Sequence, residues 1–323
     1  MAVYTHLTSA DIGQVLAAYD VGALRSAKGI AEGVSNSNWL IETEHEGATR
    51  RFILTVFEAR TETADLPFFL SLLDHLSARG QPVPRTIHTR EDARMIEVRG
   101  KPAALIEFLP GISIDEPSPG EARSVGGALA GLHEATQDFA QTRASSLPLT
   151  TCVAMLRDHA DRFGEIDPQL AAILPDCGAE LVERWPDDLP TGTIHADLFP
   201  DNVLLVDGAV TGLIDFYFAC TGMLAFDLAV THAAWSFAAS DNAFRPGIGA
   251  ALIGGYEGRR PLSDAERAAL PLLAQGACLR FVATRVEDWF ATPADGLVRR
   301  KDPMQFARRL AFYRTHGEAA FRT

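Results

Sequence analysis

The stretch that decides the fold is Ile194-His195-Ala196-Asp197-Leu198-Phe199-Pro200-Asp201-Asn202-Val203-Leu204-Leu205, which is followed by Leu213-Ile214-Asp215-Phe216. It predicts a loop, a strand, a turn at Gly208 and a second strand. His195, Asp197 and Asn202 have the spacing H-x-D-x-x-x-x-N, and Asp215 ends the second apolar run. We therefore expect two carboxylates and a carboxamide close together. Such a set suits phosphoryl transfer, because carboxylate and amide oxygens bind Mg²⁺ and a second carboxylate can orient a substrate hydroxyl.

Each of these residues also has a purely structural interpretation. Asp201, Asn202 and Gly208 are common turn formers, and His195 can be a buried scaffold residue. For His195 we favour the scaffold role. For Asp197, Asn202 and Asp215 together we favour the functional interpretation, because the strands, the spacing and the order of the surrounding elements agree with one fold.

The length and charge of the chain limit the number of domains and the kinds of binding partner. A chain of 323 residues is long enough for two domains or one large one. Its 29 Lys and Arg against 42 Asp and Glu give a net charge of −13, which argues against nucleic acid or a membrane as a partner. A small polyanion can still bind if a metal or a few cations are placed locally.

The sequence favours a cytoplasmic protein. Its four cysteines are far apart and form no C-x-x-C pair, which is typical of reduced thiols. The first residues lack the pattern of a signal peptide. The most apolar window, residues 223–239, contains Asp227 and His232 and is too short to cross a bilayer comfortably.

The order of elements predicts two lobes. Strand candidates at residues 39–43 and 51–57 flank a turn containing Gly47, a helix candidate follows at 66–76, and a second strand pair lies at 95–98 and 103–108. From the capping box at Ser118 onward the pattern is mostly helical. We expect an N-terminal lobe with an antiparallel sheet over residues 1–108, a hinge at 107–111 and a helical C-terminal lobe over 112–323.

The catalytic-loop residues resemble those of the aminoglycoside phosphotransferase-like branch of the protein-kinase-like fold. The resemblance implies an α+β fold with a nucleotide-binding N-terminal lobe and a catalytic, acceptor-binding C-terminal lobe. It makes Asp197 the catalytic carboxylate, and Asn202 and Asp215 the ligands of a Mg²⁺ that accompanies ATP. Ala196 stands where protein kinases usually have Arg, which favours the small-molecule branch.

The same resemblance assigns a nucleotide site and a brace. The small, polar turn that contains Gly33, Val34, Ser35, Asn36 and Ser37 would lie over the phosphates, although it suits an ordinary hairpin turn equally well. The segment Glu107-Phe108-Leu109 stands where the family binds the adenine edge through backbone groups. Asp227, inside an apolar helix, would brace the catalytic loop together with His195. The alternative is a surface position for Asp227.

One position departs from the family pattern, because Thr55 stands where most members have a Lys that contacts phosphate. Lys28, Arg51 and Arg60 are the candidates to replace that cation. A longer resemblance to the bacterial homoserine kinases of this fold accounts for the change, since that branch also has Thr there. The segments that carry it include 1–5, 29–38, 52–58, 66–69, 194–202, 213–221, 279–281 and 284–285.

Homoserine kinases phosphorylate a zwitterionic amino acid in threonine biosynthesis, so the acceptor site needs groups of both signs. Arg280 or Arg285 is predicted to bind the carboxylate and Asp288 the ammonium. Tyr217 is predicted to line the same site. A salt-bridged surface helix, with Tyr217 in the core, is an equally good interpretation of these residues.

Two other functions remain open from the sequence. The first is a kinase of the same fold that acts on an aminoglycoside, choline or a sugar. The second is a nucleotide-binding module without catalysis, which Thr55 suggests. In all cases we expect small-molecule ligands, with no nucleic acid and no membrane as partners.

Overall fold

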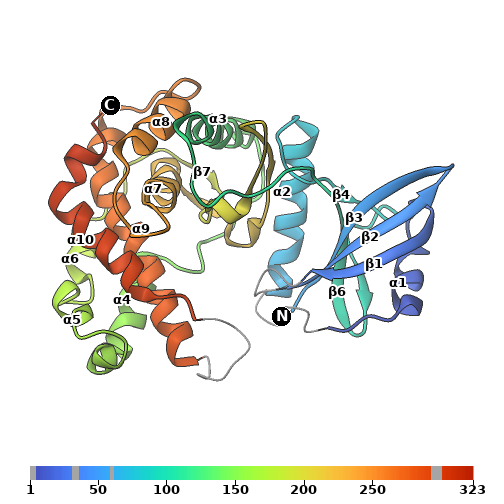
Figure 1. The fold of residues 1–323 in the computed structure, drawn as a ribbon, viewed down its shortest axis with the longest axis horizontal. Coiled ribbons are helices and arrows are strands. Elements are labelled where there is room, and N and C mark those ends of the chain that lie inside the picture. The colour runs from blue at the N-terminus through green and yellow to red at the C-terminus, as the bar shows by residue number, and fades with distance from the viewer. Residues whose placement is uncertain (1–4, 31–35, 59–61, 292–299, 323) are drawn as a thin grey trace. The chain divides into compact units, whose positions relative to one another are not determined.

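The computed structural model describes residues 5–30, 36–58, 62–291 and 300–322. The chain divides into two compact units, Met1–Pro110 and Gly111–Thr323 (Figure 1). Among the described residues, no helix is long and apolar enough to cross a membrane.

The Met1–Pro110 unit is built on an antiparallel sheet. Its strands follow the order β1-β2-β3-β6-β4, and β5 pairs with β6. Two helices accompany the sheet, α1 and α2. The bounds are α1 Ser9–Leu16, β1 Ala23–Ile30, β2 Ser37–His45, β3 Ala48–Val56, α2 Leu66–Ala78, β4 Thr86–Ile87, β5 Ile96–Val98 and β6 Lys101–Glu107.

Local sequence explains these elements. Glu46 and Gly47 have φ of 51° and 78°, which closes the β2–β3 hairpin in the left-handed conformation that suits the twist of its strands. Thr8 and Asp11 form a capping box at the start of α1. The buried face of α1, including Ile12 and Val15, then packs into one apolar cluster with sheet residues such as Leu54.

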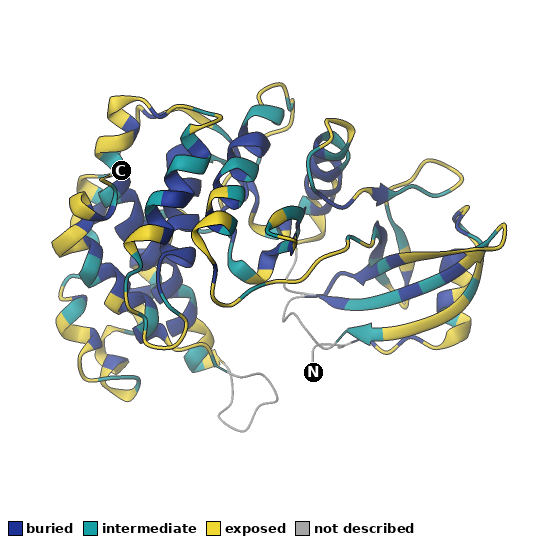
Figure 2. Ribbon diagram, turned by 45° about the horizontal axis from the view of Figure 1, so that its top comes forward, coloured by how far each residue is buried: buried dark blue, intermediate teal, exposed yellow. Residues whose placement is uncertain are grey.

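The Gly111–Thr323 unit is mostly helical. Two small antiparallel sheets, β7 with β10 and β8 with β9, carry the segment quoted at the outset. The bounds are α3 Pro119–Ala135, α4 Leu149–Asp158, α5 Leu170–Ile173, α6 Ala179–Glu183, β7 Thr191–Ile194, β8 Val203–Val206, β9 Ala209–Leu213, β10 Cys220–Met223, α7 Leu224–Trp235, α8 Pro246–Glu257, α9 Asp264–Ala291 and α10 Pro303–Ala320. Figure 2 shows that the helices turn buried residues toward one another and exposed residues outward. The predicted α+β fold, with an antiparallel sheet followed by helices, is confirmed.

Close packing of α3 against α8 depends on glycine. A Cβ atom on Gly126 would lie 2.0 Å from the carbonyl oxygen of Leu252, and one on Gly255 would lie 2.0 Å from the carbonyl oxygen of Arg123. Backbone atoms cannot yield as a flexible side chain does. These two glycines therefore set the distance between the helices that frame one side of the unit.

We predict that Gly126→Ala lowers the free energy of unfolding by about 1–3 kcal/mol or more, because the added methyl group forces α3 and α8 apart. Gly127→Ala is the matched control, since its Cβ would meet its nearest atom at 3.7 Å. The control should be neutral or stabilising by up to about 1 kcal/mol, as expected for Ala over Gly in a helix. Urea unfolding of both variants measures the difference. Equal stability of the two variants would contradict the packing argument.

Candidate functional site

The catalytic loop begins where β7 ends. His195, Ala196 and Asp197 follow Ile194 directly, and a short 3₁₀ turn, Pro200–Asn202, leads into β8. Ala196 and Asp215 adopt φ of 62° and 65°. Residues with a Cβ atom enter this left-handed region at a cost, so other contacts must hold both positions.

Asp227 on α7 is the main anchor of the loop. Its Oδ2 accepts the backbone N–H of His195 at 2.7 Å, and its Oδ1 accepts that of Ala196 at 2.7 Å. Its side chain is fully buried, so the alternative of a surface position for Asp227 is wrong. Burial alone would raise the pKa of Asp227, but hydrogen bonding from His133 and the nearby backbone N–H groups bring it below the ordinary value.

His133 extends this anchor into α3 and α8. Its Nε2 lies 3.1 Å from Asp227 Oδ2, and its Nδ1 lies 2.7 Å from the hydroxyl of Tyr256. The sequence did not reveal His133 as a partner of the loop, because it lies 94 positions from Asp227. The signal that could have revealed His133 as a partner of the loop is its place in the last turn of a helix with a buried apolar face.

His195 occupies a scaffold position. Burial lowers its pKa, which favours the neutral ring. Its Nδ1 accepts the backbone N–H of Asp197 at 3.2 Å, so its Nε2–H is the donor to the carbonyl oxygen of Ile214 at 3.0 Å. The ring thus ties the catalytic loop to the residue before Asp215.

Asp197 and Asn202 are held together by hydrogen bonds. The Nδ2 of Asn202 donates to the backbone oxygen of Asp197 at 2.8 Å and lies 3.4 Å from its Oδ2. The backbone oxygen of Asn202 accepts the N–H of Ile214 at 3.0 Å, which draws in the segment that ends at Asp215. Because the amide nitrogen of Asn202 serves Asp197, its amide oxygen is the atom suited to a cation.

The carboxylates of Asp197, Asp201 and Asp215 lie close enough together to repel one another. The pKa of Asp215 is raised to about 7 by the protein atoms crowded around it and then by the negative charges of Asp197 and Asp201, even though its side chain reaches solvent. Burial likewise raises the pKa of Asp197, and the charge of Arg280 opposes this most strongly. A cation beside Asp215 would relieve the repulsion.

The two arginines of α9 that were predicted at the acceptor carboxylate, Arg280 and Arg285, lie in different environments. Arg280 donates through Nη1 to the carbonyl oxygen of Ala196, and its Nη2 lies 3.7 Å from Asp197 Oδ1. Arg285 donates through Nη1 to the backbone oxygen of Asp302 and to Gln305 Oε1, both at 2.8 Å. Both arginines are buried, so the surface-helix interpretation is wrong for them. Burial lowers the pKa of Arg285 to about 10.

Two further residues were predicted to bind or line the acceptor site. Asp288 is exposed near the end of α9, and Tyr217 is half-buried two residues after Asp215. Of the two arginines, Arg280 is the one that lies beside Asp197, whereas Arg285 contacts residues at the start of α10.

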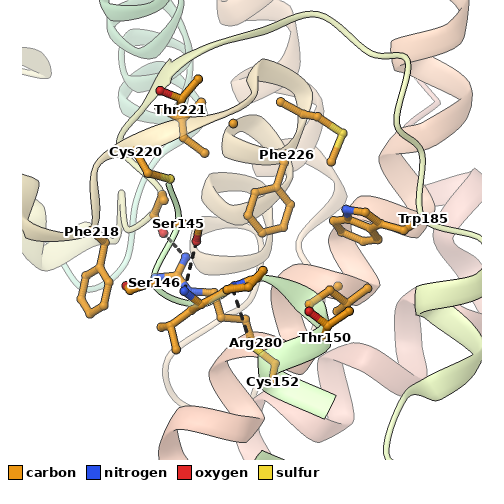
Figure 3. Close-up of a pocket in the computed structure, with 18 of the residues that line it drawn as sticks. Ser145, Ser146, Thr150, Cys152, Trp185, Phe218, Cys220, Thr221, Phe226 and Arg280 are labelled. Atoms are coloured by element: carbon orange, nitrogen blue, oxygen red, sulfur yellow. Dashed lines mark hydrogen bonds between the residues drawn. The ribbon is translucent and has the colours of Figure 1, made fainter. Parts of the chain in front are cut away.

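A cavity of about 440 Å³ adjoins the catalytic loop within the same unit (Figure 3). Arg280 and Ala196 form part of its wall, and most of the remaining surface is apolar. The rings of Trp185 and Phe226 meet edge to face with centroids 5.7 Å apart. The sequence did not predict this cavity, because its walls come from segments between α3 and β7, from β10 and from α9.

In the Met1–Pro110 unit, Thr55 is buried and its hydroxyl donates to Asn38 Oδ1 at 2.9 Å. Lys28 is exposed on β1, and Arg51 forms an ion pair with Glu42 at 2.9 Å. Arg60, the third cation considered, lies outside the described residues.

Lys101 is a cation that the sequence analysis did not single out. It pairs with Glu58, which is buried just after β3 and accepts the hydroxyls of Thr5 and Ser37 at 2.6 Å each. The backbone N–H of Glu58 also donates to Asn36 Oδ1 at 3.2 Å. These bonds tie the first residues of β2 to the end of β3.

The remaining residues predicted to bind the nucleotide are residues 33–35 and 107–109. Gly33, Val34 and Ser35 lie outside the described residues. Glu107 ends β6 and exchanges two hydrogen bonds with the backbone of Arg85, at 2.9 and 3.2 Å. Phe108 is exposed and Leu109 half-buried.

Comparisons with known proteins identify the family of this chain. The phosphotransferase enzyme family (APH) matches residues 26–262. A homoserine kinase of Phenylobacterium zucineum is 48% identical over 315 residues, which cover 98% of this chain and 96% of that protein. A homoserine kinase of Caulobacter vibrioides is 47% identical, with coverage of 97% and 98%.

Solved structures share the fold at low identity. A spectinomycin phosphotransferase in complex with ADP and spectinomycin has a TM-score of 0.73 at 14% identity and covers 97% of this chain and 100% of its own. A microcompartment-associated aminopropanol kinase has a TM-score of 0.69 at 19% identity, with coverage of 97% and 99%. The full-length similarity to the curated relatives decides the closer relationship: the chain belongs to the phosphotransferase enzyme family and, within it, to the homoserine kinases.

Proposed function

We propose that this protein transfers the γ-phosphate of ATP to the side-chain hydroxyl of L-homoserine and forms O-phosphohomoserine, a step of threonine biosynthesis. The observation that carries the proposal is the hydrogen-bonded arrangement of Asp197 and Asn202, with Asp215 close enough that the charge of Asp197 helps to raise its pKa. Similarity to homoserine kinases over nearly the whole chain supports homoserine as the acceptor. A cytoplasmic location fits this role.

Mg²⁺ fits the oxygen donors at this site. Asn202 Oδ1 and the carboxylate of Asp215 are hard ligands, and Mg²⁺ bound with a nucleotide usually takes its other ligands from phosphate and water. Among the residues that the structure describes, no cluster of three or more His, Cys, Asp or Glu side chains could hold a metal without a nucleotide. When bound, Mg²⁺ neutralises the negative charge of the phosphates.

Asp197 orients the acceptor. Its carboxylate accepts a hydrogen bond from the homoserine hydroxyl, whose oxygen attacks the γ-phosphorus as the bond from phosphorus to the ADP oxygen breaks. A carboxylate is too weak a base to ionise an alcohol beforehand, so Asp197 receives the proton as the new bond forms. Asn202 holds the main chain and side chain of Asp197 for this step.

The remaining assignments are part of the same proposal. Residues 33–37 would bind phosphates and residues 107–109 the adenine edge. Because Thr55 supplies no positive charge, the metal must neutralise more of the phosphate charge than in relatives with a lysine at that position. Asp288 and Tyr217 would bind or line the acceptor site, with an arginine of α9 at its carboxylate.

We predict that ADP release with Mg²⁺ depends on homoserine and falls to the background rate when EDTA removes the metal. Steady-state assays with homoserine, an aminoglycoside, choline and a sugar as acceptors check the choice of substrate. Turnover of another acceptor while homoserine fails would overturn homoserine as the substrate. ATP binding without transfer to any of them would favour a non-catalytic module.

We also predict that Asp197→Asn lowers kcat by about 10²- to 10⁴-fold while ATP binding persists, since the amide can neither accept the proton nor orient the hydroxyl equally well. Asp207→Asn is a matched control, because Asp207 is exposed in the β8–β9 turn at φ 51°, a conformation that Asn tolerates. Calorimetry with an ATP analogue and steady-state kinetics give the two readouts. Turnover near that of the unmodified protein in Asp197→Asn would refute the assigned role.

A further inference from the structure

We propose that Arg280 is a positioning residue that clamps the catalytic loop from α9, in place of the acceptor-carboxylate ligand predicted from the sequence. The inference rests on the proposed function, because Asp197 is the proposed catalytic carboxylate. Arg280 acts on the loop through two of its guanidinium nitrogens.

The guanidinium holds both the main chain and the side chain beside it. Nη1 donates to the carbonyl oxygen of Ala196, a residue 84 positions away, and Nη2 lies 3.7 Å from Asp197 Oδ1. The side chains of Arg280 and Asp197 are 5% and 18% exposed. A planar fork with fixed donor directions can serve two acceptors on adjacent residues, which a lysine ammonium does less well.

Ala196 shows why such a clamp is needed. Its φ of 62° is unfavourable for a residue with a Cβ atom. Asp227 on α7 accepts its N–H, and Arg280 on α9 donates to its C=O. Both polar backbone groups of Ala196 are thus bound by buried charged side chains from different helices, and the direction of the Asp197 side chain follows from that geometry.

The surroundings of Arg280 keep it in place. Its guanidinium lies over the rings of Phe218 and Phe281, with centroids at 5.0 and 4.9 Å. It also borders the cavity of about 440 Å³ (Figure 3).

Arg309 on α10 provides a matched control. It is buried to a similar degree, with 3% of the whole residue exposed against 4% for Arg280. Like Arg280, it donates through Nη1 to a backbone carbonyl oxygen, that of Ala233 at 2.8 Å, and its Nε donates to Asn242 Oδ1 at 2.7 Å. Substitution of Arg309 therefore reports the general cost of altering a buried arginine that bonds to the main chain.

The test compares Arg280→Lys with Arg309→Lys in steady-state kinetics of the full-length protein. We expect Arg280→Lys to lower kcat by about tenfold or more while KM for ATP and for homoserine change by less than about threefold. Arg309→Lys should keep kcat even if its melting temperature falls. A higher KM for homoserine with unchanged kcat in Arg280→Lys would make Arg280 an acceptor ligand, and unaltered kinetics would also overturn the clamp.

A rescue experiment separates positioning from structural damage. Arg280→Ala removes a guanidinium at the wall of the cavity, between two aromatic rings, where added ethylguanidinium can bind. We expect ethylguanidinium to restore part of kcat in Arg280→Ala and ethylammonium to restore less, because the ammonium lacks the two-donor fork. Equal rescue by both would contradict the positioning role. Full turnover by Asp197→Asn would instead remove the proposed function on which the inference rests.

Discussion

The catalytic loop depends on one buried carboxylate. Asp227 has no solvent exposure, yet its two oxygens accept the N–H groups of His195 and Ala196, and His133 supplies a further hydrogen bond. Burying a carboxylate costs several kcal/mol unless such donors compensate it. Removing the charge would leave two buried N–H groups poorly satisfied at the point where the chain enters its left-handed turn. Through these bonds the helical unit fixes the start of the loop that carries Asp197.

The negative charge of this protein disfavours phosphate binding, but it also supplies carboxylates that suit a cation. With a net charge of −13, the chain has no general attraction for phosphates. The protein atoms crowded around Asp215 raise its pKa, and the negative charges of Asp197 and Asp201 raise it further. A divalent cation held by Asp215 and Asn202, as proposed, would resolve both problems, since it would attract the nucleotide phosphates and reduce the repulsion among the carboxylates. Arg280 supplies the opposing charge on the other side of Asp197.

Local patterns predicted well what local interactions determine. The spacing from His195 to Asn202 is set by a short loop and a 3₁₀ turn, so the sequence alone indicated that Asp197 and Asn202 meet. Hairpin and capping signals likewise predicted β2, β3 and α3. Contacts between distant segments were not predictable in this way. The bond from Arg280 to Ala196 joins α9 to a loop 84 residues earlier, and only helix packing determines which arginine of α9 arrives there.

The most direct test of this dependence on Asp227 is to measure kcat for homoserine phosphorylation together with hydrogen exchange at the His195 and Ala196 amides in Asp227→Asn. The Asn side chain keeps one accepting oxygen and turns a donor toward a backbone N–H. We predict faster exchange at these amides and a kcat lowered by about tenfold or more, with the distant β2–β3 amides unchanged. Unaltered exchange at His195 and Ala196 with full turnover would contradict the role of Asp227 as the anchor of the catalytic loop.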